Sequence, residues 1–213
     1  MNPTIDPDLA ATLRRLKLGQ VLTTLPERLA LAKTNQLSHA EFLQIVMSDE
    51  VSRRDSASAT LRAKTASLDP TMMLDRWDPS ATVTYNRSLL DELASLRFVD
   101  AGNNVIIMGP VGVGKTFLAT ALGHTAIRRR HSVHFERTDR LLKRLRVSRL
   151  DNSHDVEIRK LLRVEVLILD DFALAAMDAN DTAAIYDYAD CVIMPRRARL
   201  SWSVGPLGRD RSA

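Results

Sequence analysis

The sequence predicts an α/β fold, in which helices flank a parallel β-sheet and a small all-helical domain precedes the sheet. Three observations support this prediction. Apolar residues over residues 1–70 follow helical spacing, strands alternate with helices after residue 104, and the expected strands are continuous apolar runs. Such runs are typical of strands buried on both faces of a parallel sheet. We therefore expect a helical domain at 1–70 and an α/β domain at 71–213.

The first domain is expected to hold three helices. The apolar stripe that begins at Leu9 ends before Pro26, and this proline predicts the first turn of a second helix, because proline lacks the N–H that a helix interior needs. Ser38 and Glu41 match a capping box, in which each side chain bonds the backbone N–H of the other residue. A third helix should therefore begin there and end before Pro70, which disfavours helix at the residue before it.

The second domain begins with a segment broken by prolines. Residues 69–84 contain Pro70 and Pro79 and show no sustained period, so we expect the domain junction there. Asn86 then predicts the N-cap of a helix. The later elements are expected as a strand at 105–108, a helix from Lys115 to the Arg128 cluster, a strand at 132–135, a helix at 138–150 and a strand at 164–171.

Composition is that of an ordinary soluble globular protein, with 45% hydrophobic and 26% charged residues. No apolar run approaches the roughly 20 residues that cross a bilayer, and the N-terminus lacks the basic-then-apolar pattern of a secretory signal. Cys191 is the only cysteine, which excludes an intrachain disulfide and a cysteine cluster for a metal. We expect a cytoplasmic protein with no membrane partner.

A phosphate-binding loop pattern follows the strand at 105–108. The pattern G-x-x-x-x-G-K-[ST] is matched by Gly109, Pro110, Val111, Gly112, Val113, Gly114, Lys115 and Thr116. Glycines let the backbone wrap closely around an anion, and the helix that follows adds the positive end of its dipole. Lys115 is placed to reach the β and γ phosphates, and the Thr116 hydroxyl is placed to ligate Mg²⁺. The sequence therefore predicts a site for a nucleoside triphosphate.

Two acidic residues, Asp170 and Asp171, end the last expected strand. The carboxyl ends of parallel strands meet at one edge of a sheet, so these carboxylates should lie beside the phosphate loop. Asp170 is predicted to hold magnesium and Asp171 to polarise the attacking water. An aspartate is shorter than the glutamate that related ATPases use at the second position, so weak hydrolysis is favoured over fast turnover.

Basic residues are concentrated between the loop and the acidic pair. Residues 128–163 hold twelve Lys or Arg against five Asp or Glu, although the whole chain carries a net charge of only +4. Candidate contacts to double-stranded DNA on the helix at 138–150 are Arg140, Lys143, Arg144, Arg146 and Arg149. Such cations line a phosphate backbone without reading its sequence. A solvated basic face is the alternative, and aromatic residues for stacking on single strands are sparse.

Together these features resemble the IstB-like ATP-binding proteins, which are AAA+ helpers of IS21-type transposition. The resemblance covers roughly residues 9–180 and rests on LSHAEFLQIVMSDE, GNNVIIMGPVGVGKTFLATALG and LILDDFAL. It implies a P-loop NTPase fold of AAA+ type, ATP and Mg²⁺ as cofactors, assembly on DNA as a homo-oligomer, and stimulation or targeting of a transposase. By motif match it implies nucleotide contacts from Gly109 to Thr116, a catalytic Lys115, magnesium ligands Thr116 and Asp170, and water activation by Asp171.

The end of the chain departs from the family pattern. A strand that ends in a sensor asparagine and an arginine-bearing lid should follow the acidic pair, yet no asparagine follows Asn180. The segment PRRARLSWSVGPLGRDRSA is basic and lacks an apolar period. We therefore expect an ATPase domain that is incomplete at its C-terminal end, with a strand or two lost from the sheet and an open edge.

Two other functions remain open. One is a helicase loader of the DnaC type, which belongs to the same clade, and the other is a degenerate copy that binds nucleotide or DNA without hydrolysis. The family pattern leaves the adenine pocket unassigned. The segment from Tyr85 to Leu90, just before the sheet, is expected to form one of its walls.

Overall fold

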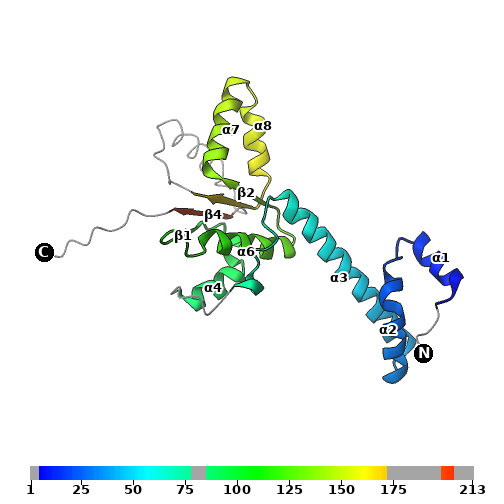
Figure 1. Ribbon diagram of the computed structural model, residues 1–213. Helices are drawn as coiled ribbons and strands as arrows, with labels where there is room; N and C mark the ends of the chain where they lie inside the picture. The colour runs from blue at the N-terminus through cyan, green and yellow to red at the C-terminus, as the bar shows by residue number, and fades with distance from the viewer. Residues whose placement is uncertain (1–4, 78–84, 172–197, 204–213) are drawn as a thin grey trace. The chain divides into compact units, whose positions relative to one another are not determined.

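The computed structural model describes residues 5–77, 85–171 and 198–203, and its contacts divide the chain into two units, Met1–Ser58 and Ala59–Ala213 (Figure 1). The division falls inside helix α3 (His39–Thr65), earlier than the boundary expected at residue 70. The reason is packing, because Ala63 near the end of α3 and Ala66 just after this helix are buried in the core of the second unit.

The first unit contains α1 (Pro7–Arg15), α2 (Val21–Thr34) and the first part of α3. Its core is built around Val21, Leu25 and Val46. The capping box at the start of α3 is confirmed. The Ser38 backbone N–H donates to Glu41 Oε2 at 2.8 Å, and the Glu41 backbone N–H donates to Ser38 Oγ at 3.3 Å.

The expectation that Pro26 would begin a helix is wrong, because Pro26 lies inside α2. Val21 and Leu25, which precede the proline in this helix, are 4% and 6% exposed and belong to one core cluster. Burial of these side chains on one helix face outweighs the single backbone hydrogen bond that proline removes.

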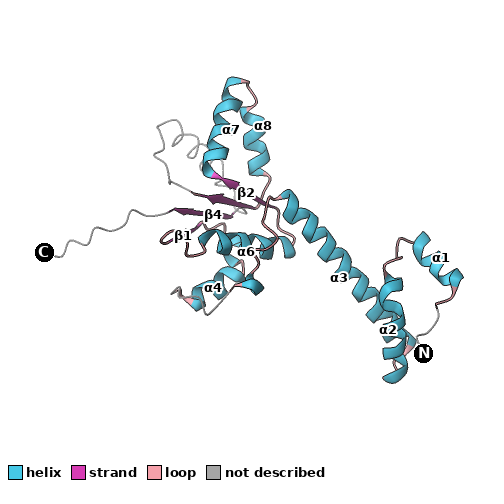
Figure 2. Cartoon of the chain, in the orientation of Figure 1, coloured by secondary structure: helices cyan, strands magenta, loops and turns pink. Residues whose placement is uncertain are grey.

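The second unit is built on a parallel sheet, as the sequence predicts, and the described residues give this sheet four strands (Figure 2). The strands are β1 (Val105–Met108), β2 (Val133–Arg137), β3 (Val166–Asp170) and β4 (Ala198–Ser203), in the spatial order β1-β4-β3-β2. The helices of this unit are η1 (Leu74–Arg76, a 3₁₀ turn), α4 (Arg87–Ala94), α5 (Arg97–Asp100), α6 (Lys115–Arg128), α7 (Thr138–Leu150) and α8 (His154–Leu162). The limits of α7 are those predicted, whereas α8 carries no prediction from the sequence.

Helices cover both faces of the sheet, with α6 on one side of the strands and α7 with α8 on the other (Figure 1). Alternate residues of β3 face the two layers. Ile168 packs in the cluster that includes Leu122 and Ile127 of α6, whereas Leu167 and Leu169 pack with side chains of α7 and α8. This double coverage explains why β3 is a continuous apolar run in the sequence.

The prediction that the sheet lacks the strand after the acidic pair is wrong. Residues Ala198–Ser203 form β4, which lies between β1 and β3 and pairs with both in parallel. In the sequence, Leu200 and Trp202 alternate with Arg199, Ser201 and Ser203, and this differs from the continuous apolar run expected of a central parallel strand. The expectation that an arginine-bearing lid is missing concerns residues 204–213, which lie outside the described part of the chain.

Residues 66–77, which follow α3, lie along α6. The side chain of Leu68 packs over Gly123, where an added Cβ would lie 3.1 Å from Leu68 Cδ2 and 2.7 Å from Ile168 Cδ1. The His124 ring nitrogen Nε2 is 2.8 Å from the Asp69 carbonyl oxygen. These contacts at the middle of α6 place the following residues, up to Trp77, near the beginning of the same helix.

Among the described residues, no helix combines the length and the apolar character that a membrane span requires.

Candidate functional site

The predicted phosphate loop lies between the end of β1 and the start of α6. Gly112 and Gly114 have φ of +85° and +88°, a left-handed conformation that glycine adopts without strain. The N-cap residue of α6 is Gly114, which has no side chain to cap the helix, so the first backbone N–H groups are available to an anion. The loop therefore has the backbone geometry that phosphate binding requires.

Lys115 is the first residue of α6, and its ammonium lies over the loop. Its Nζ donates to the Gly109 carbonyl oxygen at 2.9 Å and to the Pro110 carbonyl oxygen at 2.6 Å. The charge is thus held at the centre of the loop by two neutral acceptors. A triphosphate offers stronger, charged acceptors at the same place, so these two hydrogen bonds can be exchanged for ion pairs.

Thr116 and Asp170 are brought together from α6 and β3, as expected. The Thr116 Oγ1 lies 3.5 Å from Asp170 Oδ1 and 3.4 Å from Oδ2, which is long for a hydroxyl–carboxylate hydrogen bond. Asp170 is 8% exposed, and its backbone oxygen accepts from Thr138 Oγ1 at 2.9 Å. The carboxylate is therefore fixed next to the hydroxyl, in a buried position.

This pair fits magnesium chemically. Mg²⁺ prefers oxygen ligands and is usually held by one or two protein oxygens, with water and substrate phosphates completing its shell. One carboxylate and one hydroxyl beside the phosphate loop meet that requirement. The described residues contain no cluster of three or more His, Cys, Asp or Glu side chains that would suit a metal held by protein alone.

Asp171 lies one residue beyond β3 and has φ of +55°, a conformation that aspartate tolerates better than most residues. Its backbone N–H donates to Asp170 Oδ1 at 2.8 Å. Its Oδ2 lies 3.3 Å from an Nη atom of Arg137, the last residue of β2. The guanidinium of Arg137 also bonds Asp139, at 3.1 Å from Nε. The expected water-polarising carboxylate is therefore held in an ion pair.

A cavity of about 340 Å³ opens beside the phosphate loop. Tyr85 and Leu90, from the segment expected to form a wall of the base pocket, line this cavity. The other lining residues are Trp77, Ile107, Met108, Gly109, Pro110, Val113, Gly114, Lys115 and Leu118. The lining is mainly apolar and aromatic, which suits a flat heterocyclic base.

No sequence pattern assigns a role to Trp77, yet this residue lines the cavity. Its ring lies edge-on to Tyr85, with centroids 5.7 Å apart and planes at 83°, and 5.5 Å from the ring of Phe117. The only signal in the sequence is a large aromatic residue inside a proline-broken segment, where residues are seldom buried for packing alone.

The basic helix α7 divides its cations between two environments. Arg140, Lys143, Arg146 and Arg149 are exposed. Arg144 is only partly exposed, and its guanidinium pairs with the carboxylates of Glu136 and Glu157. Arg144, one of the five expected DNA contacts, is thus engaged within the fold.

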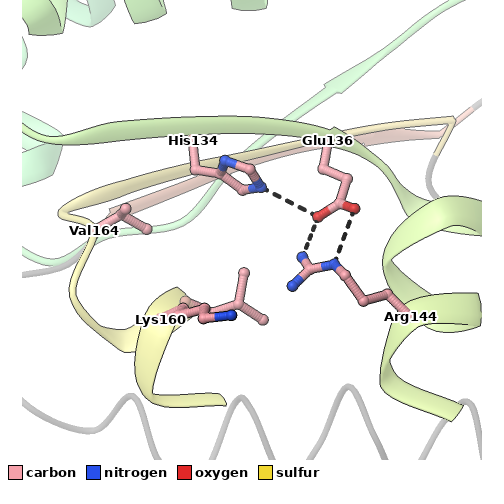
Figure 3. Close-up of a pocket in the computed structure, with 6 residues that line it drawn as sticks. His134, Glu136, Arg144, Lys160 and Val164 are labelled. Carbon is pink, nitrogen blue, oxygen red and sulfur yellow. Dashed lines mark hydrogen bonds and ion pairs between the residues drawn. The ribbon is translucent and has the colours of Figure 1, made fainter. Parts of the chain in front are cut away.

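Figure 3 shows how Arg144 and His134 converge on Glu136 at a cavity of about 210 Å³ between β2 and α8. Burial raises the pKa of Glu136, but hydrogen bonds from His134 and Arg144 outweigh burial and leave that pKa below its usual value. Burial likewise opposes the charge of Arg144, and the carboxylates of Glu136 and Glu157 overcome it and raise the pKa of the guanidinium. The ion pairs of Arg144 with Glu136 and Glu157 therefore link β2, α7 and α8.

Comparison with known proteins places the chain among relatives from insertion sequences. Residues 11–193 match the family described as IstB-like ATP binding protein. A protein of Mycobacterium tuberculosis, named as an ATP-binding protein of an insertion sequence, is 43% identical over 179 residues, which cover 83% of this chain and 71% of that protein. The ATP-binding protein named for IS1162 of Pseudomonas fluorescens is 36% identical over 169 residues, covering 79% and 73%.

Solved structures support the fold. The DnaC helicase loader aligns with a TM-score of 0.58 at 22% identity, over 66% of this chain and 80% of that one. AMPPCP-bound DnaA from Aquifex aeolicus aligns with a TM-score of 0.55 at 20% identity, over 68% of this chain and 46% of that one. At this level of identity the likeness concerns the fold, which is that of P-loop NTPases with a parallel sheet and flanking helices.

The family match spans most of the chain, and it includes the phosphate loop, the Thr116–Asp170 pair and the basic helix described above. The chain belongs to the family of IstB-like ATP-binding proteins.

Proposed function

We propose that this protein binds ATP with magnesium at the phosphate loop and uses the bound nucleotide to assist DNA transposition. The observation that carries the proposal is the meeting of three parts at one edge of the sheet. The open N-terminus of α6 adjoins the Thr116–Asp170 pair on one side and the aromatic cavity on the other. A triphosphate, its cation and its base each have a place of matching chemistry.

The residues have separate roles in this proposal. The backbone from Gly109 to Thr116 surrounds the phosphates, with an N–H donor at every position except Pro110, and the ammonium of Lys115 exchanges its loop carbonyls for phosphate oxygens. Thr116 and Asp170 hold the cation, which when bound neutralises charge on the phosphates. The base occupies the cavity that Tyr85 and Leu90 help to line.

Hydrolysis is the slower part of the proposed activity. Asp171 is the carboxylate that would orient the attacking water, and Arg137 competes with water for that carboxylate. A carboxylate that is paired with a guanidinium is less available to orient a water molecule, so turnover is expected to be low. A copy that binds ATP without hydrolysis remains the limiting case of this proposal.

Double-stranded DNA is the proposed partner of α7, through the exposed cations Arg140, Lys143, Arg146 and Arg149. The names of the relatives refer to insertion sequences, which supports a transposase as the protein partner. Assembly of several copies on DNA is part of the same proposal. The likeness of the fold to the DnaC helicase loader favours a second candidate, the loading of a replicative helicase.

Retention of double-stranded DNA on a filter, with and without ATP and magnesium, tests the proposal. ATP should increase retention by the wild-type protein, and Lys115→Ala should lose the increase while keeping the retention seen without nucleotide. Retention that is indifferent both to ATP and to this substitution contradicts the proposal. A pull-down against a transposase and a replicative helicase in parallel then separates the two candidate partners.

A further inference from the structure

The indole of Trp77 packs directly on the backbone of the phosphate loop. A Cβ added to Gly114 would lie 3.3 Å from Trp77 Cζ3 and 3.4 Å from Cη2. The space beside Gly114 is therefore filled by the indole ring. Gly114 is also the residue where the loop becomes helix, because it precedes Lys115 and has a left-handed φ of +88°.

Two aromatic rings and one backbone hydrogen bond surround Trp77 at this place. Tyr85 meets it edge-on, Phe117 packs against it from the first turn of α6, and the Trp77 backbone N–H donates to the Leu74 carbonyl oxygen at 3.1 Å. The indole Nε1 is buried and finds no acceptor among the described residues. A buried indole N–H normally has a partner, so packing against the loop, rather than hydrogen bonding, determines where this ring lies.

We infer that Trp77 is a positioning residue of the phosphate loop, and that it acts on the triphosphate as well as lining the base side of the cavity. This inference rests on the proposed nucleotide site. By filling the space beside Gly114, the indole holds that glycine in its left-handed conformation and fixes the direction of the amides at Lys115 and Thr116. Without the ring, Gly114 has a wide choice of conformations, since glycine is the least restricted residue.

The inference makes a prediction that a base-stacking role alone does not make. A residue that only stacks on the base has no effect on a ligand without a base. A residue that positions the loop affects inorganic tripolyphosphate as much as ATP. Tyr85 is the matched control residue, because it lines the same cavity and contacts Trp77. Its side chain has no atom among those nearest to a Cβ added at Gly114.

Calorimetric titration with magnesium ATP and with magnesium tripolyphosphate tests the difference. Trp77→Ala should weaken binding of both ligands by about tenfold, equivalent to about 1.4 kcal/mol. Trp77→Phe keeps a ring against Gly114 and should recover most of the tripolyphosphate affinity. Tyr85→Ala should weaken ATP binding and leave tripolyphosphate binding within about twofold of wild type, a difference of less than about 0.5 kcal/mol.

Fluorescence gives a second readout that does not depend on the alanine variant. The chain has two tryptophans, so Trp202→Phe leaves Trp77 as the only indole. Tripolyphosphate should then change the emission of Trp77, because the ligand binds at amides adjacent to the backbone on which the indole packs. Addition of Lys115→Ala should abolish the change.

The outcomes are distinct. Unchanged tripolyphosphate affinity in Trp77→Ala, or a silent Trp77 emission while calorimetry records binding, overturns the inference and leaves the proposed function intact. Failure of the wild-type protein to bind either ligand overturns the proposed site itself. If Trp77→Ala does not fold, as judged by circular dichroism, the phenylalanine variant and the emission of Trp77 decide.

Discussion

The guanidinium of Arg137 lies 3.3 Å from the carboxylate of Asp171, so the last residue of β2 holds the residue expected to polarise water. Both side chains are partly exposed, which makes the pair weak enough to open. The register of the sheet places Arg137 opposite Asp170, and Asp171 follows directly. The acidic pair is thus divided between a buried carboxylate, which we propose holds the cation, and a partly exposed one, which we propose orients the water.

Replacement of Arg137 should raise ATP turnover. Arg137→Ala releases the Asp171 carboxylate to bind water, and we expect kcat to rise about threefold to tenfold, equivalent to about 0.7–1.4 kcal/mol in the barrier, with KM unchanged. Phosphate release under steady-state conditions measures both constants. Asp139→Asn is the control, because it removes the other carboxylate partner of Arg137 and should not increase kcat. A lower kcat in Arg137→Ala would contradict this division of roles.

Gly123 should not tolerate a side chain. An added Cβ would lie 2.7 Å from Ile168 Cδ1 in the core, closer than a carbon contact allows. Gly123→Ala is expected to destabilise the protein by about 1–3 kcal/mol, as overpacking of a core usually does. Gly19→Ala is the control, because a Cβ added at Gly19 would lie 3.4 Å from Arg14 Cγ, an ordinary contact distance. Thermal melting followed by circular dichroism compares the two, and equal melting temperatures would contradict the prediction.

Arg144 and Arg140 should behave differently although both are cations of α7. Arg144→Ala leaves the carboxylates of Glu136 and Glu157 without their guanidinium, so we expect a loss of about 1–3 kcal/mol in the free energy of unfolding by urea. Arg140→Ala should change that free energy by less than about 0.5 kcal/mol, as exposed sites usually do. Instead it should reduce the salt dependence of DNA binding by about one unit of slope. A loss of stability in Arg140→Ala, together with a change only in DNA binding in Arg144→Ala, would contradict the prediction.

The first unit should lose stability in acid. The hydrogen bond from Arg53 lowers the pKa of Glu50 from 4.5 to about 2, and it outweighs burial, which raises that pKa; Arg54 adds to the effect. Because the folded pKa is the lower one, this stabilisation is complete above about pH 4.5 and is lost as the pH falls toward 2. Glu50→Gln should therefore flatten the dependence of melting temperature on pH in that window. A wild-type profile identical to that of the variant would count against the ion pairs.

The sequence was informative wherever one local rule dominates. The capping box at Ser38 and Glu41, the limits of α7 and the meeting of Thr116 with Asp170 all follow from short patterns. It was misleading where packing over long distances overrides a local rule. Pro26 is carried inside α2 by the burial of Val21 and Leu25, and β4 forms from an alternating segment because its neighbours β1 and β3 pair with it.

Trp77 illustrates a further limit of the sequence. Its proposed role in positioning the phosphate loop depends on a contact with Gly114. No spacing rule connects a residue of an irregular segment with a loop so far along the chain. The same holds for Arg144, which is one of five basic residues that the sequence groups together on α7. Their spacing does not indicate that this arginine pairs with Glu136 and Glu157. Patterns identify which side chains are charged or aromatic, but not which of them are already engaged.

The burial of Ala63, Ala66 and Leu68 in the core of the second unit determines where the chain can be cut. A fragment that started at residue 71 would lack these three side chains and the Ala66 carbonyl to which the Phe135 N–H donates at 2.9 Å. Such a fragment would leave an apolar hollow beside Ile168 and would tend to aggregate. Dissection of the two units should therefore retain the last turns of α3 with the nucleotide-binding half.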